Sequence, residues 1–306
     1  MKSTQQLIFA ILLGASVSLV SCGGSDSGTS ENQEPEGNKS KKKEAPHSSL
    51  LKVGDKIFNL PSPLETAMLL EEVGGHFNES ILNPSVDASQ YSTKEAQAMN
   101  LGVYGADLGY CLIYNQSQKA FRLLANCKKL GTELGISPAL YSDLMKRFEG
   151  NMENKDSLLI FVSELNRLSD QYLKENENGD ISALILYGGW VESLHFVGEL
   201  TKSLENDELR IRVGEQKNTL QNLIGLLEQE NRENSFDDLL SDLRDLEKTF
   251  EKVETSYTYV EPDTRPEEQL TIVRSKSAVN LDDALLDEIL DKVNALRTKI
   301  ITSAAT

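Results

Sequence analysis

The sequence has few of the residues on which metal sites and disulfide-rich folds depend. Its 306 residues include three histidines and three cysteines, and three cysteines cannot form a disulfide framework. Basic residues are also scarce, with 31 Lys and Arg against 48 Asp and Glu. The resulting net charge of −17 repels phosphate backbones, so we expect no nucleic-acid partner. With 39% hydrophobic residues, the chain is too apolar to be wholly disordered and long enough to bury a core.

The motifs of the common enzyme classes are also absent from the sequence. It contains no Ser-His-Asp nucleophile elbow, CxxC, HExxH, P-loop or dinucleotide-binding GxGxxG. We therefore expect a protein that is not an enzyme and that needs no cofactor.

The N-terminus carries an export signal. A basic residue, Lys2, precedes an apolar run from Leu7 to Val20. This run is about 14 residues long, whereas a membrane-spanning helix needs roughly 20. A basic start, a short apolar core and small residues before the cleavage site are typical of a secretory signal peptide. We expect this signal peptide to comprise residues 1–21.

The signal ends in Leu19-Val20-Ser21-Cys22, which matches a lipobox, so the segment resembles the signal peptide of bacterial lipoproteins. The resemblance implies cleavage between Ser21 and Cys22. It also implies a diacylglycerol on the Cys22 sulfur and an acyl chain, such as palmitate, on the new amino group. This covalent lipid is the one added group that we expect, and it would hold the protein at a membrane.

Residues 22–50 are predicted to be a flexible linker. Gly, Ser, Asn, Glu and Lys predominate there, so little apolar surface is available to offset the entropy of ordering. The residue after Cys22 is Gly23 and not Asp, which in enteric lipoproteins favours the outer membrane over retention at the inner one. We therefore expect a lipoprotein of the cell envelope, at the outer membrane, with a folded domain over residues 51–306.

Helix signals dominate this domain and predict an all-α fold, either a multi-helix bundle or stacked helical hairpins. Ser62-Pro63-Leu64-Glu65 combines an N-cap, a proline at the first helical position and a capping-box glutamate. Ser92 and Glu95 form a second capping box. A small β-hairpin is possible near residues 257–275, where prolines interrupt the helical pattern. The predicted helices cover about 62–74, 92–114, 116 to either 131 or 135, 137–150, 156–175, 180–204, 207–230, 236–255 and 281–302.

Two of these helices, over about 92–114 and 180–204, are apolar on nearly all sides and belong in the centre of the fold. They share an LxxYG pattern, Leu101 to Gly105 and Leu184 to Gly188, at an offset of 83 residues. Either chance or an internal duplication of a helical hairpin explains it. The stretch NLGVYGADLGY at 100–110 resembles uncharacterised helical lipoproteins of Bacteroidota, from which no activity carries over.

The best candidate for a polar site is the ExxH formed by Glu192 and His195, which share one face of a helix. Ferritin-like di-iron bundles use two such Glu–His pairs. This chain cannot supply the second pair, because His47 lies in the linker and the residue three positions before His76 is Val73 and not Glu. A mononuclear metal or ligand site could be built from Glu192, His195 and Asp107. The alternative is a buried polar cluster satisfied by hydrogen bonds within the fold.

Other residues of these helices have structural or binding interpretations. Gly102, Gly105 and Gly109 either allow another helix to approach closely or leave a groove for a ligand. Cys111 and Cys127 lie in consecutive helices at positions too far apart for a disulfide, so we expect two buried thiols.

These observations favour a non-enzymatic envelope lipoprotein that binds a protein partner or serves as a scaffold. The partner would be an envelope protein, and the membrane would be contacted through the lipid anchor. The alternative is a lipoprotein that binds a small ligand or a metal ion through Asp107, Glu192 and His195.

Replacing Cys22 with Ala or Ser removes the thiol that the lipid would modify. We expect either variant to lose lipid labelling and to be released or mislocalised, as measured by acyl incorporation and membrane fractionation. Unchanged acyl incorporation in these variants would contradict the lipoprotein interpretation.

Overall fold

The computed structural model describes residues 49–53, 56–60, 63–84, 87–204, 206–265, 270–272 and 276–303. These belong to one compact unit, residues 45–306, which is all-α as the sequence predicted, with short antiparallel strands added. The signal peptide, Cys22 and most of the linker lie outside the described residues. The α-helices are α1 Pro63–Glu72, α2 Lys94–Ile113, α3 Ser117–Glu133, α4 Pro138–Glu149, α5 Lys155–Glu175, α6 Gly179–Leu204, α7 Asp207–Glu230, α8 Asp237–Glu251 and α9 Asp283–Ile301.

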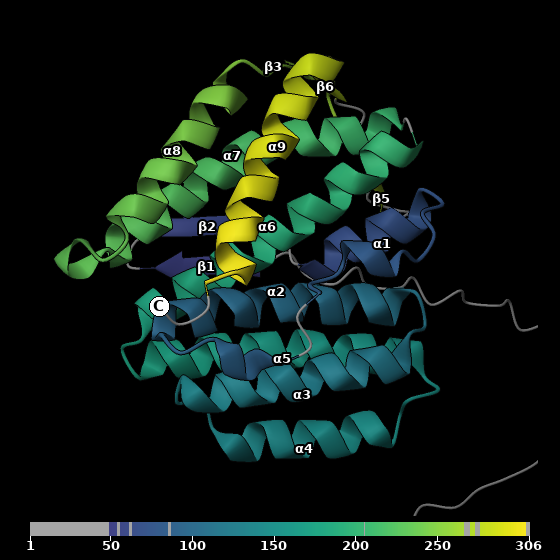
Figure 1. The fold of residues 1–306 in the computed structure, drawn as a ribbon. Helices are drawn as coiled ribbons and strands as arrows, with labels where there is room; N and C mark the ends of the chain where they lie inside the picture. Colours follow the sequence, from purple (N-terminus) through teal and green to yellow (C-terminus); the bar gives the residue numbers. More distant parts are fainter. Residues whose placement is uncertain are drawn as a thin grey trace, which may run out of the picture. The chain divides into compact units, whose positions relative to one another are not determined.

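Helix α6 lies at the centre of this unit. It packs against α2, α1 and α5 on one side and against α7 and α9 on the other. Helices α2 to α5 lie side by side in one group, and α7 to α9 form a second group (Figure 1). Among the described helices, α6 alone is long and apolar enough to cross a membrane, but 89% of its apolar window is buried inside the fold.

Helices α2, α5, α7 and α9 begin where short polar side chains cap them. Thr93 has extended backbone angles, and its side chain accepts a hydrogen bond from the Ala96 backbone N–H at 3.1 Å. The expected capping box at Ser92 and Glu95 is therefore shifted by one residue, because Ser92 and Thr93 are both good caps and only the backbone geometry selects between them. Asn154, Asn206 and Asp282 cap α5, α7 and α9 in the same way.

A β-hairpin precedes the helices, and its strands are β1 Ser49–Val53 and β2 Lys56–Leu60. They pair antiparallel, with Val53 opposite Lys56. Strand β1 thus includes the last two residues of the expected linker, Ser49 and Leu50. The sequence does contain a signal for this hairpin, because Gly54-Asp55 separates two apolar runs by two residues.

The second β structure, the ribbon, spans residues 254–280 and confirms the expected hairpin near 257–275. Strand β3 Glu254–Thr258 pairs with β6 Lys276–Asn280, and β4 Asp263–Arg265 pairs with β5 Leu270–Ile272. Pro262 lies between β3 and β4 and cannot donate a ladder hydrogen bond.

Glycines set the distance between α2 and α6. A Cβ on Gly102 would lie 2.0 Å from the Ile185 carbonyl oxygen, and one on Gly188 would lie 1.9 Å from the Met99 carbonyl oxygen. The two backbones therefore touch without intervening side chains. Gly105, one turn after Gly102, differs because a Cβ there would meet nothing within 4 Å. Both interpretations of the glycines hold: Gly102 allows close packing, and Gly105 borders open space. The LxxYG patterns lie at this crossing, and their duplication stays a prediction.

A matched pair of substitutions tests this crossing. Gly102→Ala should lower the free energy of unfolding by about 1–3 kcal/mol, because the new methyl group collides with backbone that cannot rotate away. Gly105→Ala should leave stability unchanged or raise it by up to about 1 kcal/mol, because alanine is the better helix former and has room. Urea unfolding of both variants measures the difference, and equal effects would contradict the geometry.

Candidate functional site

The polar residues singled out from the sequence lie in the core between α2, α6 and α9. Asp107 on α2 and Glu192 on α6 are both fully buried, with 0% of each residue exposed. The Asn83 backbone N–H donates to Asp107 Oδ2 at 3.3 Å. Burial raises the pKa of Asp107 well above its usual range, and the neighbouring Glu192 carboxylate raises it further. Both effects favour the protonated form of Asp107.

Glu192 pairs with a basic residue that no sequence motif indicated. Arg297 on α9 donates to both carboxylate oxygens of Glu192, from Nε at 2.6 Å and from Nη2 at 2.8 Å. The same Nη2 donates to the Ile81 carbonyl oxygen at 2.9 Å. This two-pronged geometry is the strongest form of a carboxylate–guanidinium pair. The cation that Glu192 requires is thus supplied by the chain itself.

His195 does not join this pair. Its Nδ1 lies 2.8 Å from Oδ1 of Asn294 on α9. Burial lowers the pKa of His195, and the positive charge of Arg297 lowers it further, so the imidazole is neutral at pH 7. With its proton on Nδ1, the ring presents a lone pair on Nε2, which has no hydrogen-bond partner among the described residues.

The structure thus brings Asp107 and Glu192 together, but it does not form the expected three-residue site with His195. Within the described residues, no three His, Cys, Asp or Glu side chains converge in a way that could hold a metal ion. The hydrogen-bonded cluster fits the geometry better, with Arg297, Asn294 and Asn83 as additional members. No pattern in the sequence marks Arg297 as a buried ion-pair partner, because an arginine on an amphipathic helix is normally solvent-exposed.

The two cysteines of the described region are free and buried, as the sequence predicted. Burial raises the pKa of Cys111 and of Cys127 to about 12. Both thiols are therefore protonated at neutral pH and do not have the thiolate character of reactive cysteines.

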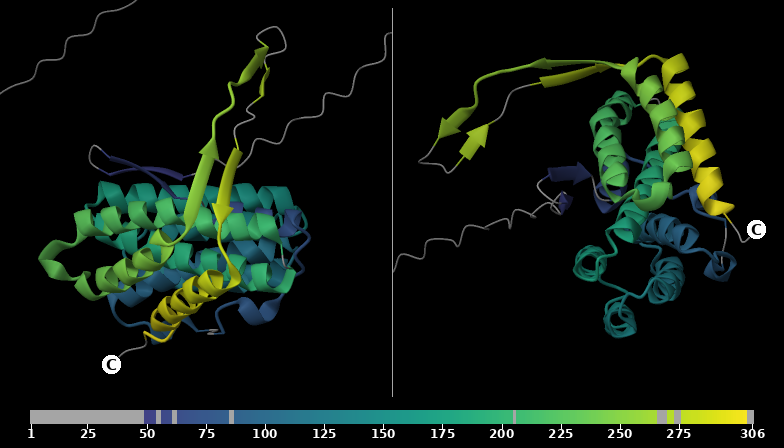
Figure 2. Two further views of the ribbon diagram at one scale, coloured as in Figure 1. Left: turned by 90° about the horizontal axis from the view of Figure 1, so that it is seen from above. Right: turned by 90° about the vertical axis from the view of Figure 1, so that its left-hand side faces the viewer.

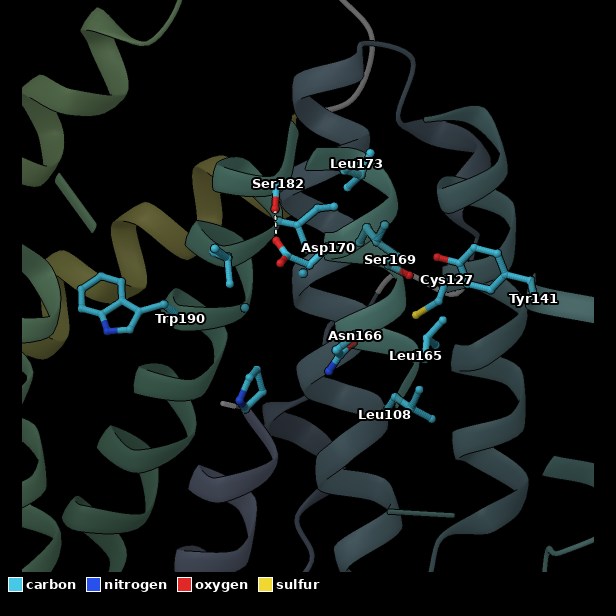
Figure 3. Close-up of a pocket in the computed structure, with 17 residues that line it drawn as sticks. Leu108, Cys127, Tyr141, Leu165, Asn166, Ser169, Asp170, Leu173, Ser182 and Trp190 are labelled. Atoms are coloured by element: carbon cyan, nitrogen blue, oxygen red, sulfur yellow. Dashed lines mark hydrogen bonds between the residues drawn. The ribbon is translucent and has the colours of Figure 1, made fainter. Parts of the chain in front are cut away.

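A pocket lies away from the polar cluster, between α2, α5 and α6 (Figure 3). None of Asp107, Glu192 and His195 lines it. It is bordered by Gly105 and by Trp190, the single tryptophan of the chain. The space available for a ligand is thus separate from the charged core.

Comparison with known proteins gives no relative for this chain: no family model, curated protein or solved structure matches it.

The proton on Asp107 predicts a distinct pH dependence. A carboxyl whose pKa rises on folding keeps its proton after the unfolded chain has released it, at about pH 3.9. The contribution of Asp107 to the free energy of unfolding of the wild type therefore decreases as the pH rises above that value. Asp107→Asn keeps an acceptor for the Asn83 N–H and needs no proton, so it should gain stability relative to wild type between about pH 5 and pH 8 in urea titrations.

The control for this experiment is Asp245→Asn. Asp245 is exposed, and its hydrogen bond and ion pair with Lys292 lower its pKa, so any effect of removing it should have the opposite sign. A stability difference between Asp107→Asn and wild type that does not change with pH would contradict a protonated Asp107.

Proposed function

We propose that the protein is a lipid-anchored envelope lipoprotein whose helical domain presents the ribbon, residues 254–280, to a protein partner. The observation that carries this proposal is the position of the ribbon. In both views of Figure 2 its strands extend away from the helices. A segment that contributes so little to the core is not needed to bury the helices.

The base of the ribbon is held firmly by α7. Val253, just before β3, is buried, and its carbonyl oxygen accepts a hydrogen bond from Lys217 Nζ at 3.2 Å. Val279 on β6 packs where Gly214 leaves space, because a Cβ on Gly214 would lie 2.3 Å from Val279 Cγ1. These contacts fix the direction of the ribbon, which reduces the entropy lost on binding a partner.

Beyond this base the ribbon is solvent-exposed. Residues 254–256 and 258–261 are exposed, and Tyr259 has 66% of its surface accessible. In the part of the chain that the structure describes, each ribbon strand pairs with one neighbour only. An outer strand edge offers unpaired backbone groups to which an extended segment of another protein can add. Tyrosine is also among the residue types enriched at binding hot spots.

The proposed anchor explains how such a domain reaches its partner. A lipid on Cys22 would fix the chain to the membrane, with the outer membrane as the proposed site. A flexible linker of 26 residues, 23–48, would have an end-to-end distance of roughly 30 Å. The ribbon could then search the space next to the membrane surface. This role is one of binding, without catalysis and without nucleic acid.

The second candidate function, binding of a metal or ligand by Asp107, Glu192 and His195, has weaker support. Arg297 already occupies both oxygens of Glu192. A bound cation would have to displace a buried guanidinium. Breaking a buried ion pair costs about 3–5 kcal/mol.

Site-specific photo-crosslinking in cells tests the ribbon. A photoreactive phenylalanine at Tyr259 should give one discrete adduct with an envelope protein. The matched control is the same probe at Ile160 on α5, which is equally exposed at 69% but lies outside the ribbon. An identical adduct pattern at both positions, or none at Tyr259, would contradict the proposal.

A shortened ribbon separates loss of binding from loss of folding. Thr258 and Lys276 are cross-strand partners, so Asn-Gly in place of residues 259–275 would join them by a two-residue turn. This variant should keep its melting temperature and lose the partner, as measured by co-purification with the protein identified at Tyr259.

A further inference from the structure

The pocket between α2, α5 and α6 has the composition of a small-molecule site (Figure 3). Its volume is about 110 Å³. The walls are mainly apolar and include Leu101, Leu108, Leu165 and Trp190. Predominantly apolar walls with a few placed polar groups are typical of pockets that bind small organic molecules.

Both Gly102 and Gly105 of α2 line the pocket. At Gly102 the backbones of α2 and α6 touch, whereas a Cβ on Gly105 would meet nothing within 4 Å. Glycine inside a helix and an unfilled cavity both destabilise a fold. Any larger residue at 105 would fill part of the space, so this position combines two destabilising features that a bound molecule would offset.

The polar groups of the pocket differ in whether they already have hydrogen-bond partners. Asp170 on α5 accepts hydrogen bonds from Ser182 Oγ at 2.5 Å and from Lys174 Nζ at 2.6 Å, so its charge is already compensated. Ser169, by contrast, is 9% exposed, and its hydroxyl makes no hydrogen bond of normal geometry within the described residues. It lies near the Tyr141 hydroxyl, at the end of the pocket next to Cys127.

From these features we infer that the pocket binds a small, uncharged, mostly apolar molecule with one hydroxyl or carbonyl group, which pairs with Ser169. Charged ligands are excluded by the apolar walls, because a buried charge needs a partner and Asp170 already has two. The size is also limited: a dry cavity of about 150 Å³ accommodates benzene, and this pocket is smaller, at about 110 Å³. A short aliphatic chain is the fitting class. This site is distinct from the Asp107 cluster and independent of the ribbon.

The test uses the chain from residue 22 onward with Cys22→Ser, so that no detergent competes for the pocket. It retains the whole compact unit, residues 45–306. The probes are 1-butanol and pentane, which are similar in size and differ in the hydroxyl group. Fluorescence of Trp190 reports on the pocket directly, and the melting temperature reports on binding independently. Both probes should bind, with 1-butanol about three- to tenfold tighter, as expected for one hydrogen bond to a buried hydroxyl.

Two variants locate the binding. Gly105→Leu should fill the pocket, raise or maintain the melting temperature and abolish the response to both probes. Ser169→Ala should bind both probes and lose the preference for 1-butanol. Gly109→Ala is the control, because Gly109 contacts Leu64 of α1 and does not line the pocket, and it should bind like wild type.

Several results would overturn the inference. One is the absence of any change in Trp190 fluorescence or melting temperature with either probe at saturation in water. Another is binding that Gly105→Leu leaves intact, which would place the molecule elsewhere. Equal affinity of wild type for the two probes would refute the role of Ser169. If Gly105→Leu does not fold, Gly105→Ala replaces it, and unchanged affinity in that variant would count against the pocket.

Discussion

The backbone contact between α2 and α6 is the constraint on which the other features of the domain depend. Two glycines, Gly102 and Gly188, allow main chain to meet main chain, and any side chain at either position would separate the helices. Because α6 also contacts α7 and α9, the crossing fixes the two helical groups relative to each other. Gly105, one turn further along α2, lines the pocket, and the same pair of helices brings Asp107 and Glu192 together. The helix pair that meets at these glycines therefore carries both the empty and the charged part of the core.

The cost of burying two carboxylates is met in two different ways. Burial favours the proton on Asp107, and Glu192 takes Arg297 as a partner. A buried ion pair seldom adds net stability compared with apolar packing, but breaking it is costly. Through its Nε and Nη2 atoms Arg297 ties α9 to α6. Its further hydrogen bond to the Ile81 carbonyl oxygen ties the loop before α2 to α9.

Much of this fold follows from local sequence signals, because caps and apolar periodicity act within one helix. The positions of α5, α7 and α9 were predicted from such signals, and the one-residue error at Ser92 arose where Thr93 is an equally good cap. Pairings between distant segments have no such signal. Glu192 and His195 share a helical face, yet their partners, Arg297 and Asn294, lie about one hundred residues away. The different outcomes at Gly102 and Gly105 depend on the path of α6, which no spacing within α2 encodes.

The pairing of Glu192 with Arg297 also affects the order in which the domain is completed during synthesis. Arg297 belongs to α9, the last of the described helices, so it leaves the ribosome after the other eight. Until α9 is present, Glu192 on α6 lacks its guanidinium partner, and the buried ion pair cannot form. A chain that ends before α9 would lack the counter-ion altogether, so incomplete products would be left open to proteolysis.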